Sequence, residues 1–135
     1  MRLSTFQPQA LSLLRIVAGF AFSLHGFQKI LGWLGGMGGN GATASVMSLP
    51  WIAGILELVG GLLLVVGLFT VPVAFILSGQ MAVAYFMVHF PQGFFPIANR
   101  GELAALYCFI FLYIATAGPG PWSIDQLRSR RSSLI

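Results

Sequence analysis

Charged side chains are scarce in this sequence. Asp, Glu, Lys and Arg make up 7% of its 135 residues, against about 25% in a typical soluble domain. Hydrophobic residues make up 57%, so the chain has too few polar side chains to cover a water-facing surface. We therefore expect an integral membrane protein surrounded by the lipid bilayer. At about 20 residues for each membrane-spanning helix, this length allows about four spans.

Cysteine and acidic residues are also few, and each shortage excludes a class of protein. The one cysteine, Cys108, cannot form an internal disulfide or a CxxC relay. Three acidic and seven basic residues give a net charge of +4, and most of the excess lies in the C-terminal tail. We interpret this charge as a signal for membrane topology and expect no nucleic-acid partner. The glycine-rich stretch 35–48 is unsuited to a helix and lacks the GxxxxGK[ST] pattern of a phosphate-binding loop.

Proline and glycine indicate where the apolar segments begin and end. Pro50 suits the first turn of a helix, Thr70-Val71-Pro72 is predicted to form a tight turn, and the GPGP sequence at 118–121 ends a helix. The N-terminal apolar segment is interrupted by Arg15 and is not followed by a small-x-small cleavage site, so we expect a retained first span rather than a signal peptide. The predicted spans are 10–34, 50–69, 72–88 and 101–117.

Short connections and small residues predict how these spans assemble. The connection between the second and third spans is very short, and glycines along the spans allow close helix packing. We predict an all-α fold, an integral membrane four-helix bundle in a single membrane domain covering residues 1–135, with a basic tail at 121–135. Because basic segments remain in the cytoplasm, we expect both termini to be cytoplasmic, although Arg100 weakly opposes this orientation. The basic residues near the termini are Arg2, Arg128, Arg130 and Arg131.

Polar side chains interrupt the spans, most densely in residues 14–36. Such groups are costly at membrane depth and normally face a protein interior or a wet cavity. A rise of about 1.5 Å per helical residue puts His25, Lys29 and Glu57 at one level in the outer half of the bundle. The candidate site residues are His25 and Glu57 as proton carriers, with Arg15, Gln28, Lys29, His89, Arg100 and Glu102 as ligand-binding groups.

Glu57 needs a counter-charge, because a lone carboxylate at this depth would become protonated or destabilise its span. Lys29, a protonated His25 and Arg15 are alternative partners. His and Glu exchange protons near neutral pH, while Lys, Arg and Gln can donate hydrogen bonds to a carbonyl. Together with the aromatic residues of the spans, these groups fit a quinone head better than a small oxyanion. Internal salt bridges that only fix the helix order are the alternative interpretation.

Four stretches of the chain carry a specific combination of motifs. They are LLRIVAGFAFSLHGFQKILGWLGG, ILELVGGLLLVVGLFT, VHFPQGFF with a later GEL, and TAGPGPWSIDQL. This combination resembles the DoxX family of small bacterial four-helix membrane proteins over nearly the whole chain. The recurrent polar positions of that family correspond here to Arg15, His25, Gln28, Lys29, Glu57, His89, Glu102 and Asp125.

The resemblance implies a four-span protein of the bacterial inner membrane. The family takes its name from a subunit of a thiosulfate:quinone oxidoreductase, and some members are linked to thiol-oxidation and oxidative-stress complexes with soluble partners. We therefore expect a membrane subunit of a quinone-linked oxidoreductase, with quinone as a ligand and no covalent cofactor. A soluble redox protein would be the electron donor, because the chain carries no soluble redox domain of its own.

Two other functions stay open at this point. A small-solute channel or transporter would use Arg15, Gln80 and the outer polar groups as its path, and a homo-oligomer would offset the small size of one chain. A non-catalytic anchor would hold a soluble enzyme through the basic tail. We expect Asp125 or Ser123 to cap a helix in that tail. No HExxH motif or Cys/His spacing is present, so we expect no metal site.

Overall fold

The computed structural model describes residues 2–133, and this part of the chain is helical with no strand. The all-helical prediction is confirmed. A short 3-10 turn, η1 (Leu3–Phe6), precedes the first long helix. The long helices and the short tail helix are α1 (Gln7–Leu31), α2 (Leu49–Val66), α3 (Thr70–Ala84), α5 (Glu102–Ala117) and α6 (Ile124–Ser132).

The connection between α3 and α5 is itself mostly helical. A π-helical turn, η2 (Tyr85–His89), continues α3 without a break, and a 3-10 turn, η3 (Phe90–Gln92), follows it. After Gly93, the single turn α4 (Pro96–Asn99) leads into α5. This segment exposes several aromatic and aliphatic side chains, which suits a position at the boundary between lipid and water.

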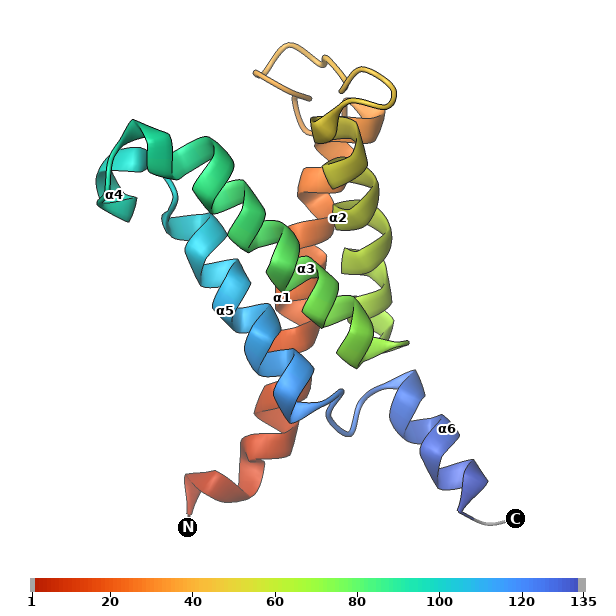
Figure 1. The fold of residues 1–135 in the computed structure, drawn as a ribbon. Helices are drawn as coiled ribbons and strands as arrows, with labels where there is room; N and C mark the ends of the chain where they lie inside the picture. The colour runs from red at the N-terminus through yellow and green to blue at the C-terminus, as the bar shows by residue number, and fades with distance from the viewer. Residues whose placement is uncertain (1, 134–135) are drawn as a thin grey trace.

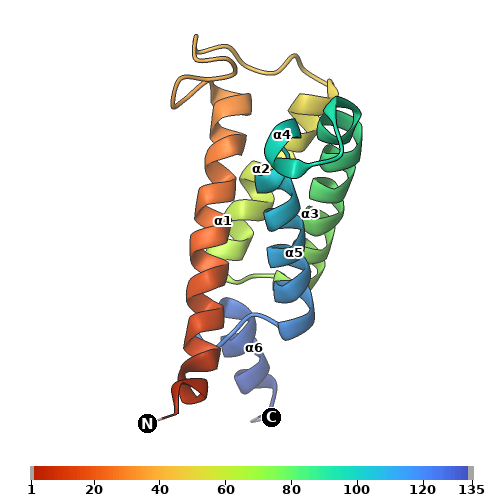
Figure 2. The same cartoon turned by 90° about the vertical axis from the view of Figure 1, so that its left-hand side faces the viewer.

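The long helices form two antiparallel pairs. Helix α1 packs mainly against α2, and α3 packs mainly against α5, with fewer contacts between the pairs. Figure 1 shows the pairs diverging toward the end that carries the glycine-rich loop and α4. Both termini lie at the opposite end, as Figures 1 and 2 agree.

Glycines explain why α1 and α2 approach so closely. A Cβ atom on Gly61 would lie 2.7 Å from the carbonyl oxygen of Gly19, and a Cβ on Gly26 would overlap the backbone of Leu58. No side chain fits between these backbones, so the two helices contact each other directly. Small residues at helix contacts are typical of membrane helices, which gain little from burying apolar side chains against one another.

The interior of the bundle is small, and its outside is apolar. Fully buried core side chains include Phe22, Leu64, Leu77 and Phe111, whereas many Leu, Val, Ile and Phe side chains on the outer helix faces are exposed. Three helical stretches are long and apolar enough to cross a membrane, and α5 is a shorter apolar helix. The outward-facing apolar surface and these stretches identify a membrane protein. The three stretches are Leu3–Leu31, Leu49–Val66 and Thr70–Gln92.

Candidate functional site

Lys29 and Glu57 form an ion pair between α1 and α2. The Lys29 Nζ atom lies 2.6 Å from Glu57 Oε1. The Glu57 side chain is almost fully buried at 3% exposure, while the Lys29 side chain remains 27% exposed. Gly54 makes room for this arrangement, because a Cβ there would lie 2.9 Å from Lys29 Cβ. Of the three alternative counter-charges for Glu57, the structure pairs it with Lys29.

Gln80 extends this pair to a third helix. Its Nε2 group donates to Glu57 Oε1 and to the carbonyl oxygen of Ala53, each at 3.3 Å. The other two oxygens of these side chains, Glu57 Oε2 and Gln80 Oε1, are buried and accept no hydrogen bond within residues 2–133. An unpaired buried acceptor is costly, so both oxygens favour a hydrogen-bond donor. We call these three residues of α1, α2 and α3 the Lys29–Glu57–Gln80 cluster.

His25 lies in an aromatic environment. Its ring meets Phe22 and Tyr107 edge-on, with ring centroids 6.5 Å from each. Tyr107 belongs to α5, so His25 is turned toward the second helix pair. Within the described residues, no hydrogen bond joins His25 to Glu57. The structure therefore does not place the two predicted proton carriers in direct contact.

The remaining predicted groups of the outer end are dispersed. Gln28 Nε2 donates to the carbonyl oxygen of Leu34 at 3.2 Å, just beyond the end of α1. His89 Nδ1 donates to the carbonyl oxygen of Asn99 at 3.0 Å. Arg100 ends α4 with a left-handed backbone (φ 60°) and is exposed, and so is Glu102 at the start of α5. The structure thus joins two of the eight predicted residues, Lys29 and Glu57, directly through their side chains.

Arg15 lies in the half of α1 nearer the termini, and its side chain is fully buried. Its guanidinium donates to the carbonyl oxygens of Leu64 and Val65 at the end of α2, and to those of Pro119 and Trp122 after α5. The C-terminal end of a helix carries partial negative charge, which favours a cation there. All three guanidinium nitrogens of Arg15 are thus occupied by backbone groups.

Residues 10–90 match the sequence model of the DoxX family. The chain belongs to the DoxX family. It is also 49% identical over 128 residues to an uncharacterized protein of Haemophilus influenzae, and the match covers 92% of this chain and 94% of that protein. No solved structure matches the chain.

Asp125 of this DoxX chain joins the tail to the α2–α3 turn. Its carboxylate accepts hydrogen bonds from the backbone N–H groups of Phe69 and Thr70 at 3.0 and 2.8 Å. Partial burial alone would raise the pKa of this carboxyl, but those hydrogen bonds and the charge of Arg128 outweigh it and hold the pKa below its usual value. Ser123, not Asp125, caps the tail helix α6, because Ser123 Oγ accepts from Gln126 N–H.

Sequence reasoning missed Asn99 as an organiser of the α3–α5 connection. Its buried amide donates to the carbonyl oxygen of Gly93 at 2.8 Å and accepts from Gly101 N–H at 2.8 Å. The signal in the sequence is an amide residue between the apolar residues and the glycines of the stretch GFFPIANRG. From the sequence, Gln80 was expected only on the path of a channel or transporter, and its bond to Glu57 could not be inferred without the α2–α3 packing.

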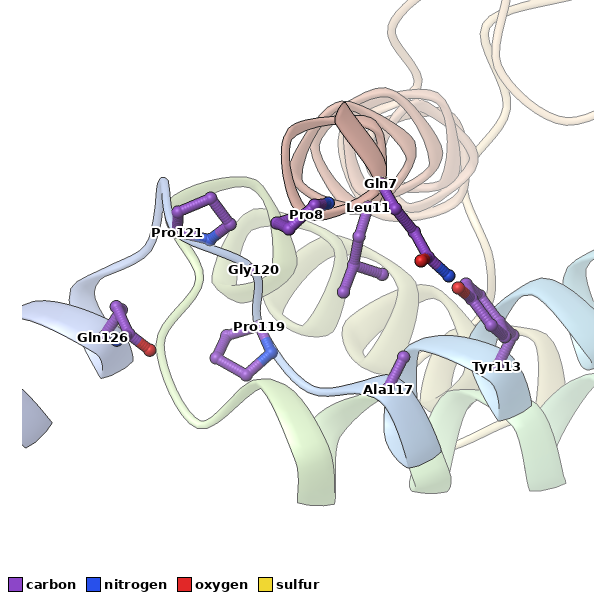
Figure 3. A pocket seen from close by; sticks show the side chains of 9 residues that line it. All are labelled: Gln7, Pro8, Leu11, Tyr113, Ala117, Pro119, Gly120, Pro121 and Gln126. Carbon is purple, nitrogen blue, oxygen red and sulfur yellow. The ribbon is translucent and has the colours of Figure 1, made fainter. Parts of the chain in front are cut away.

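The DoxX chain also has a hollow of about 470 Å³ at the end that carries the termini. Figure 3 shows Gln7 of α1 directed toward Tyr113 of α5 and Leu11 pointing into the hollow, with Pro119 on the connection to α6. None of the eight predicted site residues lines this hollow. Its walls are largely proline, glycine and neutral side chains, so it offers no charged group for chemistry.

Proposed function

We propose that this DoxX protein is the membrane subunit of a quinone-linked oxidoreductase and binds the quinone head at the Lys29–Glu57–Gln80 cluster. The observation that carries the proposal is the close placement of a cationic donor and two unpaired buried acceptors. A quinone head accepts hydrogen bonds through its carbonyls, and the reduced head donates them through its hydroxyls. A site with both kinds of group suits a ligand that changes between these two states.

The roles of the three side chains follow from their charges. Lys29 would donate from Nζ to a quinone oxygen and stabilise negative charge there as electrons arrive. A protonated Glu57 would give its proton to the reduced quinone oxygen, and Lys29 would then stabilise the carboxylate that remains. Gln80 would orient Glu57 through its amide. Complete reduction adds two electrons and two protons to the quinone. A soluble redox protein would supply the electrons, and water would supply the second proton and reprotonate Glu57.

We place the protein in the bacterial inner membrane as four spans with both termini in the cytoplasm. Helix α5 is antiparallel to α3 and packed along it, which favours α5 crossing the same layer despite its length of 16 residues. The basic residues of α6 favour the cytoplasm for the end that carries the termini. The cluster then lies in the outer half, because Lys29 is two residues from the end of α1.

A membrane anchor for a soluble enzyme remains the second candidate. Helix α6 projects from the bundle end in Figure 1, and its arginines Arg128, Arg130 and Arg131 are exposed. Such a surface suits an acidic partner protein. Changing these three arginines to Gln would release that partner while leaving quinone binding unchanged, because none of them contacts the cluster.

The test of the main proposal is a titration of the purified protein with a benzoquinone that carries one isoprenoid unit. Quenching of tryptophan fluorescence measures the binding. We expect saturable binding in wild type. The affinity should fall at least about tenfold in Lys29→Met and in Glu57→Gln, because each substitution removes one charge-assisted hydrogen bond to the ligand. Glu102→Gln is the matched control, since it removes an exposed carboxylate at the same end. Equal affinity in Lys29→Met, Glu57→Gln and wild type, or no saturable binding at all, would overturn the proposal.

A further inference from the structure

Helix α6 carries more positive charge than the chain itself balances. Its arginines Arg128, Arg130 and Arg131 are exposed, and within residues 2–133 none of them forms a salt bridge. Asp125 of the same helix already accepts two hydrogen bonds from the backbone at the start of α3. The other two acidic residues of the chain belong to α2 and α5. The arginines therefore favour a negative charge from outside the chain.

Two of these arginines share a side of α6 with apolar residues. Positions three or four residues apart follow one another along one side of a helix, and here they are Ile124, Leu127, Arg128 and Arg131. All four side chains are exposed. We call them the mixed face of α6. Arg130 lies off this face, because it is turned by about 100° around the helix from Arg131.

Exposed aromatic rings flank the mixed face. The guanidinium carbon of Arg128 lies 5.6 Å from the centre of the Phe69 ring. Phe69 belongs to the α2–α3 turn and is 54% exposed, and Trp122, just before α6, is 52% exposed. Aromatic rings and long cationic side chains occur together where a membrane protein meets the lipid head groups, since their apolar parts contact acyl chains and their polar ends contact phosphate or water.

Hydrogen bonds hold α6 at the level where the apolar helices stop. The N–H group of Asp125 donates to the carbonyl oxygen of Gly67 at 2.9 Å. Gly67 lies between the end of α2 at Val66 and the start of α3 at Thr70. Figures 1 and 2 both show α6 at the end of the bundle that carries the termini. The mixed face is thus placed beside the surface of the bilayer.

We propose that the mixed face of α6 binds the head groups of anionic phospholipids. Arg128 and Arg131 would donate charge-assisted hydrogen bonds to the lipid phosphates, and Ile124 and Leu127 would contact the upper part of the acyl chains. An acidic soluble protein would also attract the arginines, but nothing on the page gives it a use for the apolar side chains and rings beside them. This inference does not depend on the quinone function.

The experiment measures which lipid surrounds Trp122 in nanodiscs. The background Trp33→Phe/Trp51→Phe leaves Trp122 as the one tryptophan of the chain. Each sample contains phosphatidylcholine and phosphatidylglycerol, and one of the two carries bromine atoms in the upper part of its acyl chains. Quenching of Trp122 fluorescence by each brominated lipid gives the affinity of this site for phosphatidylglycerol relative to phosphatidylcholine.

We expect the protein with the intact tail to prefer phosphatidylglycerol at least about fivefold, the factor that one cation near an anionic surface contributes. The preference should fall to within about twofold of equal affinity in Arg128→Gln/Arg131→Gln. Most of it should return in Arg128→Lys/Arg131→Lys, which keeps the charge. Arg130→Gln is the control on α6 outside the mixed face, and Arg100→Gln is the control at the opposite end. Both controls should keep most of the preference.

Three outcomes would contradict the proposal. Equal affinity of the intact tail for both lipids would leave the arginines to an acidic protein partner. A preference that survives Arg128→Gln/Arg131→Gln would belong to another part of the molecule. A loss in Arg130→Gln as large as in the double variant would reflect the total charge of the tail and not the mixed face. Thermal unfolding of every variant verifies that the bundle remains folded.

Discussion

Asp125 accepts a hydrogen bond from Thr70 N–H at 2.8 Å, across 55 residues of sequence. The contact places a tail residue at the N-terminus of α3, where backbone N–H groups lack helical partners and a negative charge is favourable. Asp125 N–H in turn donates to the carbonyl oxygen of Gly67 at 2.9 Å. The tail thus satisfies both sides of the α2–α3 turn and holds the two helix pairs together at this end.

Asp125→Ala removes the acceptor at the start of α3, so we expect a stability loss of about 1 kcal/mol, as for other helix N-caps. Because the folded pKa of Asp125 lies below its ordinary value of 3.8, its contribution is complete above that value. The contribution is lost as the pH falls through the folded pKa. Thermal unfolding in detergent at pH 7 and below pH 4 measures both effects.

Asp125→Asn is the matched comparison, since it keeps an acceptor oxygen without the charge. It should retain part of the capping contribution and lose the acid dependence. An unfolding midpoint of Asp125→Ala equal to that of wild type at pH 7 would show that the tail does not stabilise α3.

Arg15→Met should destabilise the bundle by about 3 kcal/mol or more, because four backbone carbonyls lose their donor in a buried place. Arg15→Lys keeps the charge but not the planar fork, so it should recover only part of this stability. Differential scanning calorimetry of the purified variants measures the loss of stability. Arg2→Met is the control, because Arg2 is exposed. If Arg15→Met instead unfolds like wild type and loses quinone affinity, Arg15 is a ligand group.

The sequence was sufficient for the helical class and for most helix ends. The positions of proline and glycine predicted the ends of α2 and α5 to within a few residues, because the constraints that these residues put on the backbone act locally. The π-helical turn at Tyr85–His89 was not predicted, since the apolar pattern runs through it without a change. Tyr85 and His89 of this turn contact Asn99 of α4, and such a contact between distant residues cannot be seen in the local sequence.

The sequence predicted how deep each candidate residue lies along its helix, but not toward which neighbouring helix its side chain points. Counting residues from the helix ends placed Lys29 and Glu57 at one level, and the two are in contact. The same count grouped them with His25, and the predicted site also included His89 and Glu102. Depth along a helix gives no information on how one helix pair is rotated against the other. It therefore could not show that His25 faces α5 while His89 of η2 bonds to Asn99 of α4.

Gly26→Ala should cost several kcal/mol, because its new Cβ would meet the backbone of Leu58, which cannot move aside without separating α1 from α2. Gly79→Ala is the matched control in α3. A Cβ there meets nothing within 4 Å, so this variant should gain up to about 1 kcal/mol from helix propensity. We expect the unfolding midpoint to fall in Gly26→Ala and to rise in Gly79→Ala. Equal shifts would mean that close packing of α1 on α2 does not limit stability.

Lys29 and Glu57 should show strong energetic coupling. Lys29→Met leaves the Glu57 carboxylate buried beside Gln80 alone, and the loss of one partner from a buried pair costs about 3–5 kcal/mol. Because the Lys29 side chain is 27% exposed, we expect the loss of stability at the lower end of this range. In Lys29→Met/Glu57→Leu no charge remains to be desolvated, so the double variant should be more stable than Lys29→Met.

A double-mutant cycle from unfolding free energies measures the coupling between Lys29 and Glu57. Additive losses would show that the pair does not act as a unit. If the double variant is as stable as wild type but binds no quinone, stability alone does not explain why a charged pair occupies this depth.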